Sequence, residues 1–134
     1  MRPLLRPLLA ISACSALCAC AGSAAIPTPA RHTLAAGQGV TLAPRVHLTY
    51  DGVDDSRCPP DARCVWPGKL DYRFTLRAGD AAERFTLTLG KPGLAPALLG
   101  GARIELDESV EPPPPAASQQ APTPHPVTVK VTQP

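Results

Sequence analysis

The feature that most constrains this chain is an alternation of apolar and polar residues with a period of two. It recurs in short stretches separated by turn-forming residues, and no segment carries a sustained helical period. Successive side chains of a strand point to opposite faces, so the pattern predicts antiparallel sheets with one buried and one wet face. The stretches are residues 40–42, 46–50, 70–76, 85–89, 102–106 and 127–131.

Turn residues arrange these stretches into one domain. Ala78-Gly79-Asp80 predicts a hairpin, and glycines bracket the apolar segment 94–99, which we expect to be a helical turn or a loop over the core. We therefore expect an all-β fold, a small antiparallel immunoglobulin-like β-sandwich of about six or seven strands formed by residues 34–134. A small β-barrel is the alternative.

Residues 111–126 are rich in proline and interrupt the pattern before its last stretch. Proline lacks the N–H that a sheet interior requires, so this segment predicts a long connection within the domain. A recognition segment for a partner is the alternative to a simple spacer.

The N-terminus reads as an export signal. Residues 1–19 carry Arg2 and Arg6, then a short apolar run that is too short to span a membrane, then small residues. The sequence Leu17-Cys18-Ala19-Cys20 resembles a bacterial lipobox, and this resemblance implies cleavage before Cys20 and lipidation of that residue. Cys14, in Ile11-Ser12-Ala13-Cys14, is an alternative lipid carrier, and an ordinary secretory signal is a further one.

The residues after Cys20 predict a tether and a location. Residues 20–33 are small, polar and proline-bearing, which favours a flexible tether, with an edge strand near residues 31–35 as the alternative. Residue 21 is alanine and not the aspartate that favours inner-membrane retention in such lipoproteins. In a Gram-negative host the resemblance thus implies an outer-membrane lipoprotein that faces the periplasm, with the membrane as its first partner.

Charge argues against nucleic acid as a partner. The formal net charge is +2, and loss of Arg2 and Arg6 with the signal leaves the mature chain near neutral. A protein that binds nucleic acid presents a basic stripe, which this balance does not provide.

Cys58 and Cys64 are the cysteines left in the folded part if Cys20 carries the lipid. The histidines that could complete a zinc site are scattered, and five intervening residues exclude a CxxC redox motif. In an exported, oxidising compartment the pair predicts a disulfide that holds residues 59–63 in one shape.

Charged residues surround these cysteines. Asp51, Asp54 and Asp55 could ligate calcium, but the EF-hand pattern is absent, and Arg57 and Arg63 are near enough to neutralise them. We therefore favour a salt-bridged loop and expect no metal. His47 alternates with core residues, which predicts that it faces solvent.

Trp66, the chain's only tryptophan, follows the second cysteine. Because aromatic residues are scarce, we expect Trp66 to pack on the core. An exposed anchor for a partner is the alternative. The chain carries no G-x-S-x-G elbow, no HExxH and no P-loop, so we expect neither an enzyme nor a cofactor.

The segment Asp55-Ser56-Arg57-Cys58-Pro59, followed by Cys64-Val65-Trp66 and Gly68, resembles a group of small, uncharacterised bacterial lipoproteins with a DSRCP…CxWxG loop. Pro67 departs from the small residue expected there. The resemblance implies fold and location and brings no reaction.

Two functional hypotheses follow. The first is a membrane-anchored envelope lipoprotein that is a non-enzymatic structural or protein-interaction module, with Asp54, Asp55, Arg57, Arg63 and Trp66 as its candidate partner loop. The second is a periplasmic lipoprotein that binds a metal or small ligand through residues 51–55.

Overall fold

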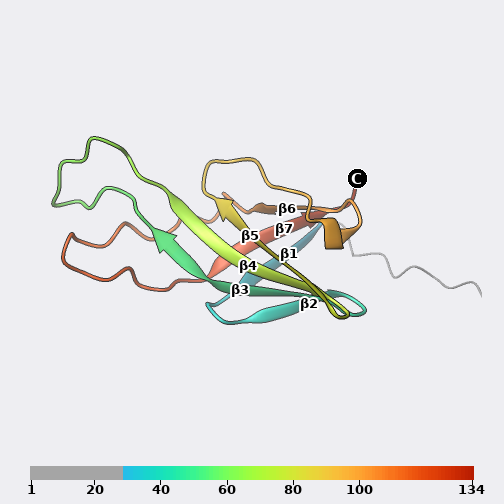
Figure 1. Cartoon of the computed structure of the whole chain (residues 1–134). Coiled ribbons are helices and arrows are strands. Elements are labelled where there is room, and N and C mark those ends of the chain that lie inside the picture. Colours follow the sequence, from blue (N-terminus) through green and yellow to red (C-terminus); the bar gives the residue numbers. More distant parts are fainter. Residues whose placement is uncertain (1–28) are drawn as a thin grey trace, which may run out of the picture.

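Two antiparallel sheets face each other in the computed structural model, which describes residues 29–134 (Figure 1). One sheet has the strand order β1-β7-β6 and the other the order β2-β3-β4-β5. The predicted small antiparallel sandwich is confirmed, with the four-stranded sheet built as a simple meander. The strands are β1 (Ala30–Leu34), β2 (Gly39–Ala43), β3 (Val46–Asp55), β4 (Leu70–Ala78), β5 (Ala81–Thr88), β6 (Arg103–Leu106) and β7 (Val127–Thr132).

The core lies between the two sheets and follows the alternation of the sequence. Both tyrosines and both phenylalanines belong to it or pack against it. The ring of Phe74 lies 5.5 Å from that of Tyr50 and 5.6 Å from that of Phe85, and such aromatic pairs contribute about 0.5–1.5 kcal/mol beyond the area they bury. The opposite sheet supplies Ile104 and the three valines of β7.

Strand β1 begins earlier than the expected domain boundary. Ala30 pairs with Val131 and Leu34 with Val127, and the side chain of Leu34 is buried. The last residues of segment 20–33 therefore form an edge strand, close to the alternative at 31–35, and they are not part of a tether. The predicted signal 1–19, Cys20 and the start of the tether lie outside the described residues.

A β-bulge in β3 changes which residues face inward. Tyr50 pairs with Phe74 and Gly52 with Arg73, so Asp51 is the extra residue. A bulge shifts the alternation by one residue. Beyond it, Val53 lies opposite the buried Tyr72, and Asp55 lies opposite the buried Leu70. Asp55 therefore faces inward at the end of the sandwich.

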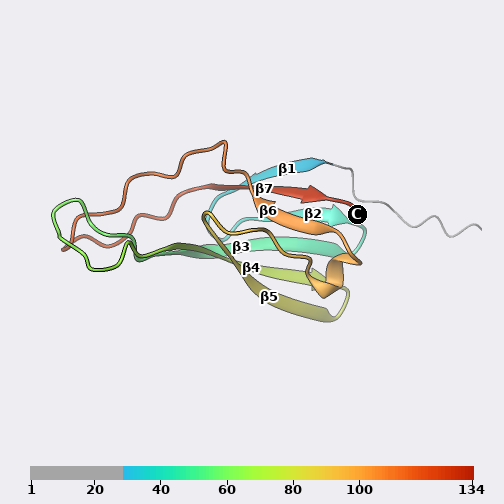
Figure 2. The same ribbon diagram turned by 90° about the horizontal axis from the view of Figure 1, so that it is seen from above.

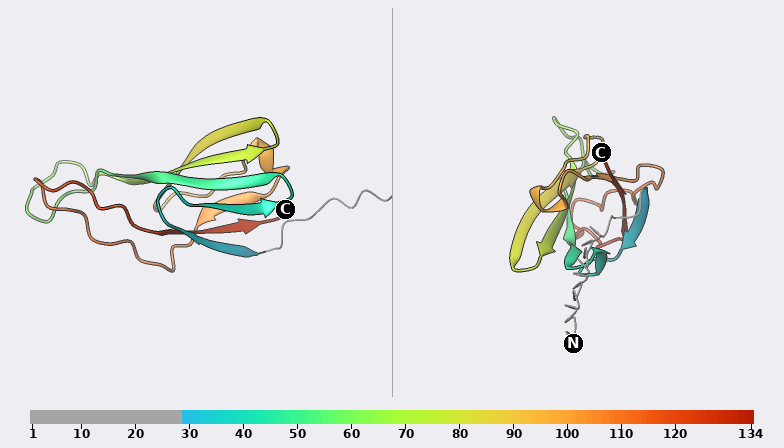
Figure 3. Two further views of the ribbon diagram at one scale, coloured as in Figure 1. Left: turned by 90° about the horizontal axis from the view of Figure 1, so that it is seen from below. Right: turned by 90° about the vertical axis from the view of Figure 1, so that its right-hand side faces the viewer.

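Two long loops extend from one end of the sandwich and lie side by side (Figures 1 and 2). We name residues 56–69, between β3 and β4, the disulfide loop, and residues 107–126, between β6 and β7, the proline loop. The first described residues, the β4–β5 hairpin and the C-terminus lie at the opposite end (Figure 3).

The β5–β6 connection contains the short 3-10 helix η1 (Ala97–Leu99) within the expected apolar segment 94–99. Leu94 pairs with Ile104 along the edge of β6. Within residues 29–134 there is no helix of the length and apolarity needed to cross a membrane.

Candidate functional site

The predicted disulfide between Cys58 and Cys64 is present, with the two Cα atoms 5.8 Å apart. The base of the disulfide loop is also fixed. Ser56 N–H donates to the Lys69 carbonyl over 2.9 Å, and Cys58 N–H donates to the Pro67 carbonyl over 3.1 Å. These bonds continue the pairing of β3 and β4 into the loop, so the loop has a defined shape.

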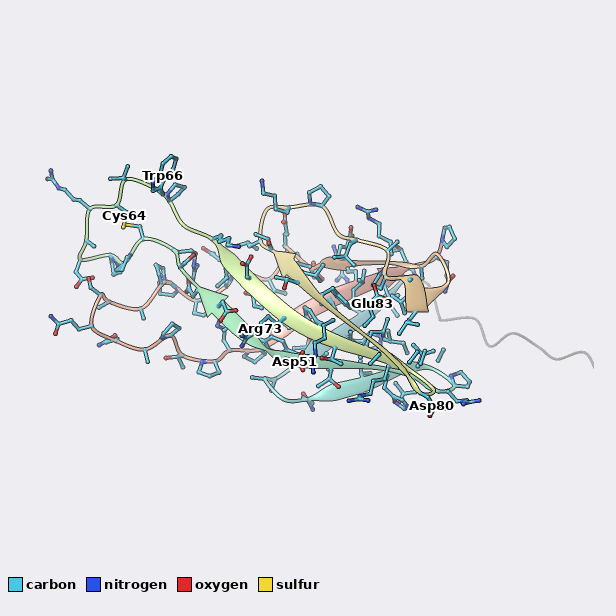
Figure 4. All side chains as sticks on the ribbon, in the orientation of Figure 1. Asp51, Cys64, Trp66, Arg73, Asp80 and Glu83 are labelled. Carbon is cyan, nitrogen blue, oxygen red and sulfur yellow. A yellow bond between two sulfur atoms is a disulfide. The ribbon has the colours of Figure 1, made fainter. Side chains whose placement is uncertain are left out.

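Trp66 is exposed, and the expectation that it packs on the core is wrong. Its exposed fraction is 79%, and that of the adjacent Val65 is 90%. The physical reason is that the core is already filled by the aromatic residues of the strands. The loop carries Trp66 beyond the end of the sandwich, where no core is available (Figure 4).

Arg57 connects the disulfide loop to the proline loop. Its Nε and Nη2 donate to the two carboxylate oxygens of Asp55 over 2.9 and 2.7 Å. Nη2 also donates to the Pro113 carbonyl over 2.8 Å. The hydrogen bond from Arg57 holds the pKa of Asp55 below its ordinary value. The prediction of a salt-bridged loop is thereby confirmed for Asp55 and Arg57.

A second contact joins the two loops farther from the sandwich. The Asp61 carboxylate accepts hydrogen bonds from the N–H and the hydroxyl of Ser118, over 2.9 and 2.8 Å. The bond from the Ser118 N–H is the main cause of a lowered pKa at Asp61. Asp61 lies between the two cysteines, so the disulfide ring itself carries this contact.

The proline loop is anchored to the sandwich at His125. The Tyr50 hydroxyl donates to the His125 carbonyl over 3.2 Å, and the Tyr72 oxygen lies 2.9 Å from His125 Nε2. Burial raises the pKa of Tyr72 and is the main reason that the pKa of Tyr50 rises to about 12. Both phenols therefore keep their protons. His125 Nδ1 lies 3.3 Å from the Thr123 carbonyl, an oxygen that can only accept, so Nδ1 is the donor of that contact.

Two cavities adjoin this arrangement. One of about 400 Å³ lies between the loops, with Asp55, Pro60 and Pro113 in its wall. The other, of about 250 Å³, lies under the proline loop and is lined by Tyr72, Leu89 and other residues. In the described chain, no buried side-chain nitrogen or oxygen lacks a hydrogen-bond partner. The buried polar side chains around the two loops thus already have hydrogen-bond partners within the described chain.

The acidic residues of β3 do not converge on one point. Thr75 donates to Asp51 over 2.7 Å, and Arg73 pairs with Asp54 over 3.2 Å, both on the outer face, whereas Asp55 faces inward. Residues 29–134 contain no group of three side chains placed to ligate a metal.

Arg63 is exposed and forms no ion pair within residues 29–134, so of the two expected arginines only Arg57 neutralises an aspartate of β3. His47 faces solvent as predicted, with Nδ1 2.9 Å from the Thr41 hydroxyl.

Sequence reasoning missed the residues that join the loops: Asp61, Ser118, His125 and the hydroxyls of Tyr50 and Tyr72. The two tyrosines carried a signal, because a buried phenol needs a hydrogen-bond partner. A scan against protein-family models, a search of curated proteins and a search of solved structures found no match to this chain.

Proposed function

We propose that this protein is a membrane-anchored lipoprotein of a bacterial envelope and acts without catalysis, by presenting its paired loops to a protein partner. The export signal and the lipobox-like segment ending at Cys20 support the anchor and, for a Gram-negative host, an outer-membrane location facing the periplasm. The carboxylates of β3 point in different directions, so their arrangement does not favour the metal- or ligand-binding hypothesis.

The observation that carries this proposal is the pair Val65 and Trp66, exposed at the end of the molecule opposite the start of β1 (Figures 1 and 4). Tryptophan is among the residues that dominate binding energies at protein interfaces. A tether leading to Ala30 would attach the membrane at one end of the sandwich. The tryptophan would then project from the other end.

The loops that present Trp66 are held in one conformation before any partner binds. The disulfide, the contacts of Arg57 and the bond between Asp61 and Ser118 all restrain them. A preorganised surface binds more tightly because less conformational entropy is lost on association. This rigidity favours a docking surface over a simple connection between strands.

Site-specific crosslinking in intact cells tests this proposal. We expect a photoreactive residue at position 65 of the full-length protein to give one discrete crosslinked product. Trp66→Ala should reduce its yield by about tenfold or more, as for a residue that dominates an interface. The control is the same photoreactive residue at Ala82, which is exposed on β5 at the other end. Equal products from positions 65 and 82, or a yield that Trp66→Ala leaves unchanged, would contradict a docking role.

A further inference from the structure

We propose that the Cys58–Cys64 disulfide is a redox control of the paired loops, and that its reduction by a dithiol releases the proline loop from the disulfide loop. The loops are the docking surface of the proposed function, so the regulatory meaning of this inference rests on that proposal. The structural part, which is the release of one loop from the other, stands on the contacts described above.

The disulfide lies outside the core. Residues 60–66 are all exposed, and no residue of the disulfide loop belongs to the core cluster. The residues paired within strands β3, β4 and β7 do not include either cysteine, and only the extension of the β3–β4 pairing into the loop involves Cys58. Breaking this crosslink therefore does not remove the interactions that stabilise the sandwich.

What the disulfide does hold is the contact between the loops. Asp61 lies within the closed ring and accepts both hydrogen bonds from Ser118. Arg57, which donates to the Pro113 carbonyl, directly precedes Cys58. A crosslink restricts the conformations of the residues it encloses, so Asp61 is already in position when the ring is closed. With the ring open, that position has to be found from many others, and the contact weakens.

In the thiol–disulfide exchange, the dithiol supplies the two electrons that reduce the Cys58–Cys64 bond. Its first thiolate attacks the sulfur of Cys64, the exposed member of the pair, the S–S bond breaks, and Cys58 leaves as a thiolate that takes up a proton. The second thiolate of the dithiol then attacks the mixed disulfide, and Cys64 leaves and is protonated. The dithiol loses two electrons and becomes a disulfide.

The structure offers hydrogen-bond acceptors to the released thiol. The sulfur of Cys58 lies 3.6 Å from the carbonyl oxygen of Ala62 and 3.7 Å from that of Pro59. A thiol at this position can donate to either oxygen, whereas the disulfide has no proton to donate. These acceptors are within reach of the Cys58 thiol at the moment the disulfide is broken.

Amide hydrogen exchange of the full-length protein in detergent, before and after treatment with dithiothreitol, tests this inference. Prolines carry no N–H, so residues 116–121 report on the proline loop. We expect exchange in 116–121 and in the disulfide loop to rise at least tenfold on reduction, with β3, β4 and β7 unchanged. Asp61→Ala in the oxidised protein should reproduce the rise in 116–121 alone. The Cys58→Ser, Cys64→Ser double variant should show the faster exchange without reductant and no further response to it.

Three results would overturn the inference. The first is unchanged exchange in 116–121 on reduction. The second is a comparable rise in the core strands, which would make the disulfide a support of the whole fold. The third is reduction that occurs only in denaturant, detected by alkylation of the two cysteines.

The crosslink at position 65 separates this inference from the proposed function. Redox control predicts that the double cysteine variant loses most of the crosslinked product. A full yield from that variant refutes redox control and leaves the docking role standing. A wild-type protein that gives no product refutes the docking role, while the exchange data still decide whether the loops are released.

Discussion

Asp107 shows how a single carboxylate joins one sheet. Its exposed fraction is 4%, and it lies directly after β6. One oxygen accepts from the Ser109 hydroxyl over 2.6 Å and pairs with Lys130 of β7, and the other pairs with Arg31 of β1. These bonds, that of Ser109 first, lower the pKa of Asp107 to about 2.

The lowered pKa of Asp107 predicts a specific dependence of stability on pH. A carboxyl group whose pKa is lower in the folded state contributes stability above its unfolded pKa of about 3.9, and this contribution is lost as the pH falls through the folded value. We therefore expect Asp107→Asn to lower the melting temperature by several degrees at pH 7. The difference from wild type should shrink between about pH 4 and pH 2.

Thermal unfolding followed by circular dichroism measures both effects of the Asp107 substitution. Asp80→Asn is the matched control, because Asp80 lies in the exposed β4–β5 turn and forms no ion pair within residues 29–134. If the difference in melting temperature between Asp107→Asn and wild type stayed the same from pH 7 to pH 2, the charge of Asp107 would contribute nothing to stability.

At the residue scale, the sequence predicts pairings that depend on chemistry and cannot predict orientation outside the strands. The pairing of Cys58 and Cys64 could be predicted because the sequence indicates export to an oxidising compartment, and because their spacing fits neither a zinc site nor a CxxC motif. Trp66 was placed wrongly because scarcity of aromatic residues says nothing about which of them the strands carry inward. Tyr50 and Phe74 occupy alternating strand positions, and their rings pack against each other in the core.

At the scale of elements, the alternation locates most strands but not the irregularity inside β3. The bulge at Asp51 turns Asp55 inward, where it meets Arg57. No one-dimensional pattern announces that extra residue. The contact between Arg57 and Pro113 was equally beyond sequence reasoning, because it joins two loops whose positions depend on the whole sheet order.

Gly68 in the disulfide loop and Gly90 in the β5–β6 connection allow the effect of backbone strain to be distinguished from that of close packing. Gly68 and Gly90 have φ values of +71° and +74°, which L-residues adopt at a cost of roughly 1–2 kcal/mol. An added Cβ meets open space at Gly90, but at Gly68 it would lie 1.8 Å from the Ser56 carbonyl oxygen. We expect Gly90→Ala to reduce the free energy of unfolding by about 1–2 kcal/mol. Gly68→Ala should also separate Ser56 from Lys69.

Urea unfolding and amide exchange distinguish the two glycine variants. We expect faster exchange of the Ser56 and Cys58 amides in Gly68→Ala, because those amides donate to Lys69 and Pro67. Gly90→Ala should leave both amides protected. Identical protection of these amides in the two variants would mean that the base of the disulfide loop absorbs the added methyl group without opening.

At the scale of the whole molecule, the sandwich follows from the sequence and the pairing of its loops does not. Alternation fixes two faces for each strand, and burying one face of each sheet requires a second sheet. The sequence predicts residues 111–126 as a connection, with a recognition segment as the alternative, and nothing local shows that Ser118 contacts Asp61. The surface that carries the proposed function is therefore a product of tertiary structure.

The start of the described chain and the paired loops lie at opposite ends of the molecule, so the identity of the lipidated residue is the last prediction to test. The described chain begins at the end opposite the paired loops, so a lipid on Cys20 would direct those loops away from the membrane (Figure 3). Stable attachment to a bilayer needs more than one acyl chain, which a lipidated N-terminal cysteine of this class provides.

We expect Cys20→Ser to abolish incorporation of an alkynyl palmitate analogue, and Cys18→Ser and Cys14→Ser to retain it. Undiminished labelling of Cys20→Ser together with loss of labelling in Cys14→Ser would assign the lipid to Cys14. If neither wild type nor any of the three variants were labelled, the protein would not be a lipoprotein.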